Sequence, residues 1–146
     1  MSLEIRMAIS PKEIDDAKSV RILVFQNEQG IPGTADFDGE DTNAIHFVTY
    51  DGNPIGAARV RFPKTKKRAK IERVAVLAEY RGKGIGKKIM QSIDVYLAKI
   101  GTQYAYLDSQ EQAKGFYEDL GYVQEGELFE EVGIPHVVMV KSLKVK

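Results

Sequence analysis

The feature that most constrains this fold is a glycine-rich basic stretch at residues 81–86, Arg-Gly-Lys-Gly-Ile-Gly. It follows an apolar, strand-like run at 71–77 and leads into an amphipathic helical pattern at 87–100. The first amides of a helix have no partner within it, and the helix dipole adds positive charge there. Glycines let the backbone approach a phosphate closely. The stretch therefore predicts an anion site at a helix start, and a turn that serves packing alone is the alternative.

Two common phosphate-binding motifs do not fit this stretch. A nucleoside-triphosphate loop needs Gly, four residues, then Gly-Lys-Ser/Thr, and Lys87 stands where the second Gly belongs. A dinucleotide fold needs Gly-x-Gly-x-x-Gly early in the chain, and here Lys87 again replaces a glycine. The pattern that remains to be explained is Arg81-x-x-Gly84-x-Gly86.

Composition narrows the class of protein. A chain of 146 residues is most simply one domain. Its 21 basic and 21 acidic residues argue against bulk electrostatic binding to nucleic acid or to a membrane. The lack of cysteine excludes disulfides, thiol catalysis and cysteine-bound zinc. With no visible signal peptide and no apolar run long enough for a bilayer, we expect a cytoplasmic protein.

The pattern of apolar residues predicts the element order β-α-β-β-β-α-β-α-β-β, which is an α+β domain with a mixed sheet. Ser10, Pro11 and Glu13 predict the start of the first helix, with a capping box, and that helix ends near Gly30. The expected strands are residues 3–7, 44–50, 55–62, 71–77, 104–107, 122–129 and 136–143. The other expected helices are residues 87–100 and 111–120.

That order, with these motifs, resembles the GNAT superfamily of acyl-CoA-dependent N-acyltransferases. Val74-Ala75-Val76 followed by residues 81–86 is similar to the family's coenzyme A pyrophosphate motif. Residues 110–122 resemble the family's Asn-x-x-Ala…Tyr helix, with Gln110 where Asn is usual. The positions that resemble the ElaA-like branch are Arg21, Val24, Phe25, Glu28, Gln29, Asp36, Asp38, Asp41, His46 and residues 133–136.

The resemblance implies a single GNAT-like domain over residues 1–146, with a mostly antiparallel mixed sheet and helices on both faces. It implies an N-acetyltransferase that uses acetyl-CoA as co-substrate and no metal, and a small-molecule or peptide amine as acceptor. The expected assembly is a monomer or a homodimer. The cofactor-binding residues that it implies are Val74, Ala75, Val76, Arg81, Gly82, Lys83, Gly84, Ile85, Gly86, Lys87 and Gln110.

Acetyl transfer needs an acid for the departing thiolate, and Tyr117 is the candidate. A phenol, with a reference pKa near 10, shares a proton usefully with a thiol. The resemblance supports this position directly. The alternative is a core tyrosine that packs beside Phe116.

The acceptor amine must lose a proton, and two carboxylates are candidates for the general base. Glu72 lies on the strand implied to hold the cofactor, and the alternative is a pair with Arg59 or Arg61. Glu28 matches the branch motif, and the alternative is a solvated carboxylate at a helix end. Activation of the amine through ordered water is a third possibility.

Four side chains are candidates for the acceptor site: Arg21, Phe25, His46 and His136. Two histidines ninety positions apart give little support for a metal site, and hydrogen-bonded structural histidines are the alternative. The acidic run at 36–41 fails the spacing of a calcium loop, so we interpret it as solvated, or as attracting a cationic acceptor. The basic run at 64–68 is interpreted as a solvated hairpin tip.

Three other functions compete with the acetyltransferase. A non-catalytic acyl-CoA sensor needs the turn at 81–86 but does not need Tyr117. An acyl-homoserine-lactone synthase shares an Arg…Val-Phe helix followed by acidic residues, although its chains are generally longer. A nucleotide-binding regulatory module would use the turn for a different phosphate.

Overall fold

The computed structural model describes residues 2–143. The chain forms two compact units. The first unit comprises the residues up to 61 together with 72–93. The second unit comprises 62–71 together with the residues from 94 onward.

Seven strands form one mixed sheet in the order β1-β2-β3-β4-β5-β7-β6. Their bounds are β1 Glu4–Ala8, β2 Ile45–Asp51, β3 Asn53–Arg61, β4 Arg68–Val76, β5 Tyr104–Gln110, β6 Val123–Glu131 and β7 Ile134–Ser142. The β1–β2, β2–β3, β5–β7 and β6–β7 pairs are antiparallel. The β4–β5 pair is parallel, with Arg68–Lys70 opposite Tyr104–Tyr106. The predicted fold class, α+β with a mostly antiparallel sheet, is confirmed.

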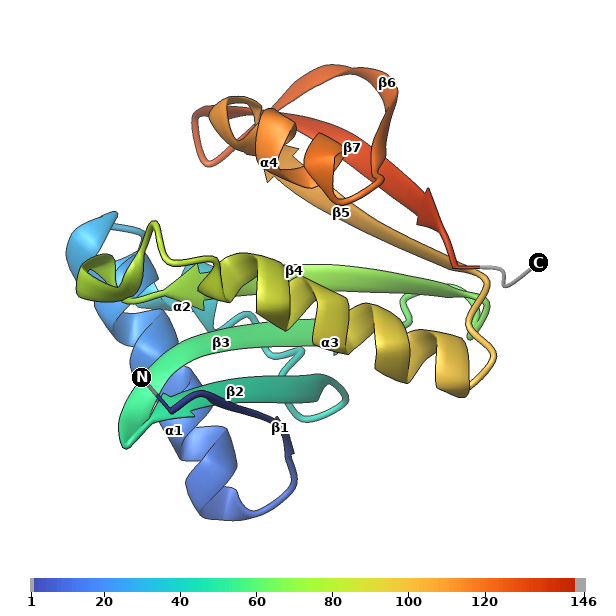
Figure 1. Ribbon diagram of the computed structural model, residues 1–146. Helices are drawn as coiled ribbons and strands as arrows, with labels where there is room; N and C mark the ends of the chain where they lie inside the picture. The colour runs from blue at the N-terminus through green and yellow to red at the C-terminus, as the bar shows by residue number, and fades with distance from the viewer. Residues whose placement is uncertain (1, 144–146) are drawn as a thin grey trace. The chain divides into compact units, whose positions relative to one another are not determined.

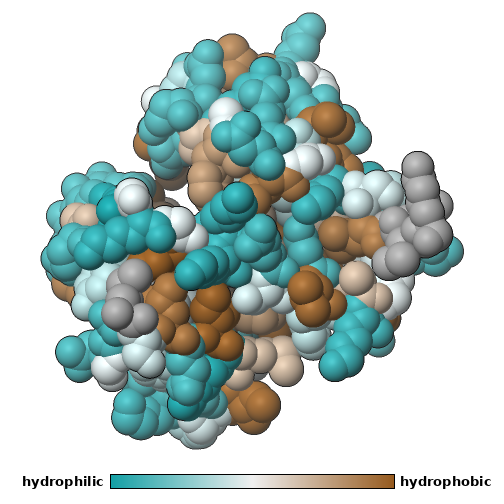
Figure 2. Space-filling model, viewed as in Figure 1, coloured by the Kyte–Doolittle hydropathy of each residue, from teal (hydrophilic) through white to brown (hydrophobic). Residues whose placement is uncertain are grey.

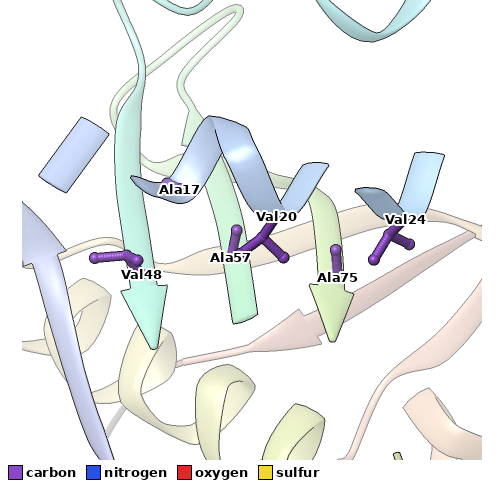
Figure 3. Packing of buried hydrophobic residues seen from close by; sticks show 6 residues of the cluster. All are labelled: Ala17, Val20, Val24, Val48, Ala57 and Ala75. Carbon is purple, nitrogen blue, oxygen red and sulfur yellow. The ribbon is translucent and has the colours of Figure 1, made fainter. Parts of the chain in front are cut away.

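The first unit is built around helix α1, Pro11–Arg21, which lies across β2 and β3 (Figure 1). Ser10 Oγ accepts from the Glu13 amide at 3.1 Å, and Glu13 Oε1 accepts from the Ser10 amide at 3.0 Å. The predicted capping box is therefore formed. Small and β-branched side chains let the helix approach the sheet closely (Figure 3). The labelled residues form one buried cluster, which we call the α1 cluster: Ala17, Val20, Val24, Val48, Ala57 and Ala75.

The opposite face of this part of the sheet is covered by the first turns of α3, Ile85–Lys99. Gly56 and Ala57 are neighbours on β3 and therefore face opposite sides of the sheet. Ala57 packs in the α1 cluster, whereas a Cβ at Gly56 would lie 3.0 Å from Ile89 Cδ1. Within the first unit, helices thus lie on both faces, as expected.

In the second unit half-buried and fully buried residues alternate along β5, whereas nearly every residue of β6 is exposed. The register of β6 against β7 shifts between Glu125 and Phe129. A short 3₁₀ turn, η3 Glu111–Ala113, follows β5 and leads directly into helix α4, Lys114–Asp119. The single helix expected over 111–120 is therefore two short pieces.

The first unit also contains elements that the sequence did not predict. The π-helix η1, Ile22–Glu28, directly continues α1, and a one-turn helix α2, Gly33–Asp36, lies within the expected loop. A 3₁₀ turn, η2 Ala78–Tyr80, follows β4. On the face shown in Figure 2, hydrophilic and hydrophobic residues are interspersed. Among the described residues, no helix has the length and apolarity that crossing a bilayer requires.

Candidate functional site

The turn between η2 and α3 has the backbone geometry of an anion site. Gly82 and Gly84 both have φ +78°, a left-handed conformation that side chains rarely adopt. A Cβ at either position would meet nothing within 4 Å, so the turn is open there. Helix α3 begins at Ile85, and the Lys88 amide donates to Gly84 O at 3.2 Å. The amides of the first turn of α3 have no acceptor within the helix, which is the arrangement that binds phosphate groups.

Arg81, the first residue of the motif, is held by two partners within the first unit. Its Nε donates to Val76 O at 2.9 Å. Its two terminal nitrogens donate to the carboxylate of Glu28 at 2.5 and 2.7 Å. The sequence proposed Glu28 as a base and Arg81 as a phosphate ligand, and the structure brings the two together. Hydrogen bonds from Arg81 lower the pKa of Glu28, because they favour its charged form.

Next to the turn, β4 carries the segment expected to hold the pantetheine arm. Ala75 is buried, whereas Val74 and Val76 are half-buried. Arg73, just before this segment, has φ 55°, a strained conformation for a residue with a side chain. Its guanidinium donates to Ala35 O at 2.9 Å and lies 3.3 Å from Asp38 Oδ2. The side chain thus ties β4 to the segment that follows η1.

A cluster of charges around the buried side chains Arg21, Asp36 and Arg59, which we call the buried ion network, lies in the first unit. Its members are Arg21, Asp36, Asp38, Asp41, Arg59 and Glu72. Arg21, only 1% exposed, donates to Asp36 Oδ1 at 3.0 Å and to Asp41 Oδ1 at 2.7 Å. Arg59 donates to Asp38 Oδ1 at 2.8 Å and to Asp41 Oδ1 at 3.0 Å. The interpretation of residues 36–41 as a solvated loop is wrong for Asp36, which is buried, and for Asp41, which is half-buried between two arginines, whereas residues 38–40 are exposed.

Glu72 is bound by arginines, which was the alternative to its role as a base. Its Oε1 accepts from Arg59 at 3.1 Å and from Arg61 Nε at 2.5 Å, and its Oε2 accepts from Arg61 at 3.1 Å. The charge of Glu72 helps to raise the pKa of Arg61. Two guanidinium groups thus hold both oxygens of the Glu72 carboxylate.

The other candidates in the first unit are largely buried. His46 Nε2 lies 2.9 Å from Asp41 O, and burial lowers the pKa of His46 because it disfavours the charged ring. Its Nδ1 has no partner within residues 2–143. Phe25 packs, partly buried, against the α1 cluster. The structure thus brings Arg21 and His46 together around Asp41, and neither presents an open polar face.

In the second unit, Tyr117 lies on α4 with its ring half-buried. The ring makes edge contacts with Phe116 at 5.0 Å and with Tyr122 at 6.0 Å between centroids. Burial raises the pKa of Tyr117 to about 12, because it disfavours the phenolate. The hydroxyl therefore remains protonated at neutral pH, as a general acid requires.

Gln110 and His136 face each other across the β5–β7 ladder of the second unit. Gln110 Oε1 accepts from Gln112 Nε2 at 2.5 Å. His136 stacks on Phe129 at 5.8 Å between centroids, and its Nδ1 lies 2.7 Å from Ile134 O. Both side chains thus make local contacts within the second unit.

Sequence reasoning did not select Arg73. It named Asp36 and Asp41 with Arg21 as positions of the ElaA-like branch, but it did not pair them with Arg21. The charges of Arg59, Asp38 and Asp41 were visible in the sequence, but their burial depends on tertiary packing. Within residues 2–143, no group of three or more His, Cys, Asp or Glu side chains has the arrangement of a metal site.

Comparison with known proteins agrees with this geometry. The family model described as acetyltransferase (GNAT) domain matches residues 21–143. A Bacillus subtilis (strain 168) protein named an acetyltransferase is 37% identical over 144 residues, 96% of this chain and 97% of that protein.

Solved structures show the same fold. The crystal structure of an N-acetyltransferase from Lactobacillus plantarum has a TM-score of 0.92 and 28% identity, covering 99% of this chain and 100% of its own. Escherichia coli ElaA has a TM-score of 0.83 and 24% identity, covering 96% of this chain and 98% of its own.

Proposed function

Because the chain belongs to the GNAT acetyltransferase family, we propose that it transfers an acetyl group from acetyl-CoA to the amine of a small molecule or peptide. The observation that carries this proposal is the open turn with two left-handed glycines at the start of α3. It supports diphosphate binding by main-chain amides, which needs no matching side chain.

Different residues are proposed to contact different parts of acetyl-CoA. The amides of residues 82–87 take the diphosphate, and the positive charges of Lys83 and Lys87 add to the attraction. The main chain of Val74 and Val76 takes the pantetheine arm, and Gln110 is a further pantetheine contact. An amide of this strand, at Val76, faces the thioester oxygen and stabilises the charge that develops on it.

Proton transfer is assigned to two side chains, Tyr117 and Glu28. Tyr117 gives its proton to the sulfur as the carbon–sulfur bond breaks, and its raised pKa supports this role. Of the two candidate bases we favour Glu28, since its ion pair with Arg81 is exposed and involves one arginine. Glu72 is held by two arginines, so we propose that it orients them rather than accepting a proton. Arg21, Phe25, His46 and His136 remain the proposed surroundings of the acceptor.

The turn is tested by giving Gly84 a side chain. In Gly84→Ala the left-handed conformation is disfavoured by about 1–2 kcal/mol, which weakens coenzyme A binding roughly tenfold. Isothermal titration calorimetry with coenzyme A measures this change. The matched control is Gly101→Ala, because Gly101 also has a positive φ, +86°, and open space at its Cβ. Equal loss of affinity in both variants, or unchanged affinity in Gly84→Ala, contradicts the proposed turn.

A further inference from the structure

The ion pair between Arg81 and Glu28 places the carboxylate of Glu28 on the residue that directly precedes the proposed diphosphate turn. Both oxygens of Glu28 accept from Arg81, at 2.7 and 2.5 Å. The two side chains are each 41% exposed, so a ligand from solvent can reach them. Arg81 is the residue directly before Gly82, where the turn opens.

A guanidinium binds a carboxylate and a phosphate in the same bidentate way. A diphosphate at the turn and the carboxylate of Glu28 are therefore alternative partners for Arg81. They also repel each other, because both are negative and the site is partly exposed. Glu28 is the last residue of η1, a seven-residue π-helix, which is a rare element that is frequent at functional sites.

We propose that the diphosphate of the coenzyme displaces Glu28 from Arg81, so that cofactor binding releases the end of η1. This inference rests on the proposed function. In the cofactor-free protein Glu28 occupies the arginine and competes with the ligand. After the exchange the guanidinium faces the diphosphate, and the carboxylate of Glu28 is free for the acceptor amine. The acceptor therefore meets a free Glu28 only after acetyl-CoA has bound.

The test is the affinity of the protein for coenzyme A, measured by titration calorimetry in wild type and in Glu28→Gln. Removal of the competing carboxylate is expected to tighten binding about two- to fivefold, the scale of an exposed ion pair. If Glu28 instead assisted cofactor binding, for example by orienting Arg81, Glu28→Gln would bind more weakly.

The matched control is Glu79→Gln. Glu79 lies on η2 next to the turn and acts on Arg81 through its charge, whereas Glu28 also accepts hydrogen bonds from Arg81. Both variants remove one negative charge near the turn. The exchange predicts a larger gain of affinity in Glu28→Gln, and equal gains would show a general charge effect and overturn it.

A double-mutant cycle isolates the pair. In an Arg81→Gln background, Glu28→Gln is expected to leave the affinity unchanged, because the partner for which Glu28 competes is absent. A gain as large as in the wild-type background contradicts the exchange.

Hydrogen exchange on the wild-type protein gives a second measurement that needs no variant. Coenzyme A is expected to speed amide exchange in residues 22–29, since the end of η1 loses its tie to Arg81. Slower exchange there overturns the proposal. A wild-type protein that does not bind coenzyme A contradicts the proposed function itself. A protein that binds it with no gain in Glu28→Gln contradicts only the exchange.

Discussion

At the scale of single residues, Tyr117 is the most direct test of catalysis. Its hydroxyl is kept protonated by burial, which raises its pKa to about 12. In Tyr117→Phe the thiolate loses its acid, and a general acid contributes on the order of 10²–10⁴ in rate. We expect kcat to fall at least about 100-fold while the affinity for coenzyme A is kept. A thiol-release assay with acetyl-CoA over a panel of amines measures the loss.

The matched control removes the neighbouring hydroxyl. Tyr122 is buried, its ring contacts Tyr117, and within residues 2–143 its hydroxyl has no hydrogen-bond partner. Tyr122→Phe is therefore expected to leave turnover unchanged and not to lower stability. Unchanged turnover in Tyr117→Phe would contradict the proposed role of Tyr117 as the general acid.

The residues that sequence reasoning identified well are those whose backbone decides their role. Glycines 82 and 84 were selected from the motif, and both adopt a left-handed conformation that favours glycine. Side-chain partners were harder to predict. The sequence offered two roles for Glu72 and could not choose, because the choice depends on which face of β4 meets Arg59 and Arg61. The left-handed Arg73 left no sequence signal, since that conformation is held by carbonyls of a distant segment.

At the scale of elements, the start of α1 makes a pH-dependent contribution. Amides of Ser10 and Ile9 donate to the Glu13 carboxylate and lower its pKa from 4.5 to about 2. The charged form is thus favoured in the folded state. Its contribution is complete above about pH 4.5 and is lost as the pH falls toward about 2.

Glu13→Gln should therefore lower the free energy of unfolding at pH 7 and have little effect near pH 2. Urea unfolding at the two pH values measures the difference. The control is Asp15→Asn, a change of charge on the same helix outside the capping box. A Glu13→Gln effect of the same size at both pH values would contradict the capping role.

Elements with strong periodicity were predicted well, and their junctions were not. The amphipathic pattern located α3 within two residues, and the capping signals located the start of α1. The π-helix η1 was missed, because its residues read as a continuation of α1 and its backbone bonding depends on what the helix packs against. The helix expected over 111–120 breaks at Ala113, where the chain turns from η3 into α4.

At the scale of the whole molecule, the amino-acid composition does not show which charged residues are buried together. The equal numbers of acidic and basic residues argued only against bulk electrostatic binding to nucleic acid or to a membrane. The structure instead has three carboxylates, Asp38, Asp41 and Glu72, around a fully buried Arg59. One of them, Asp41, is shared with the buried Arg21. Burial of such charges is tolerated only when each is paired. Because the partners of Arg59 come from different segments of the chain, its position depends on all of them.

Removal of Arg59 should therefore destabilise the first unit strongly. Arg59→Leu fills the space with an apolar side chain but leaves Asp38, Asp41 and Glu72 short of a partner, at an expected cost of about 3–5 kcal/mol in the free energy of unfolding. Urea unfolding monitored by circular dichroism measures it. Arg61→Leu is the matched control, because Arg61 is partly exposed and its partner Glu72 retains Arg59. Its cost should be smaller, since water can reach this edge of the network and screen the carboxylate that remains. An equal loss of unfolding free energy in Arg59→Leu and Arg61→Leu would contradict this prediction. It would mean that the buried Arg59 stabilises the first unit no more than the partly exposed Arg61 does.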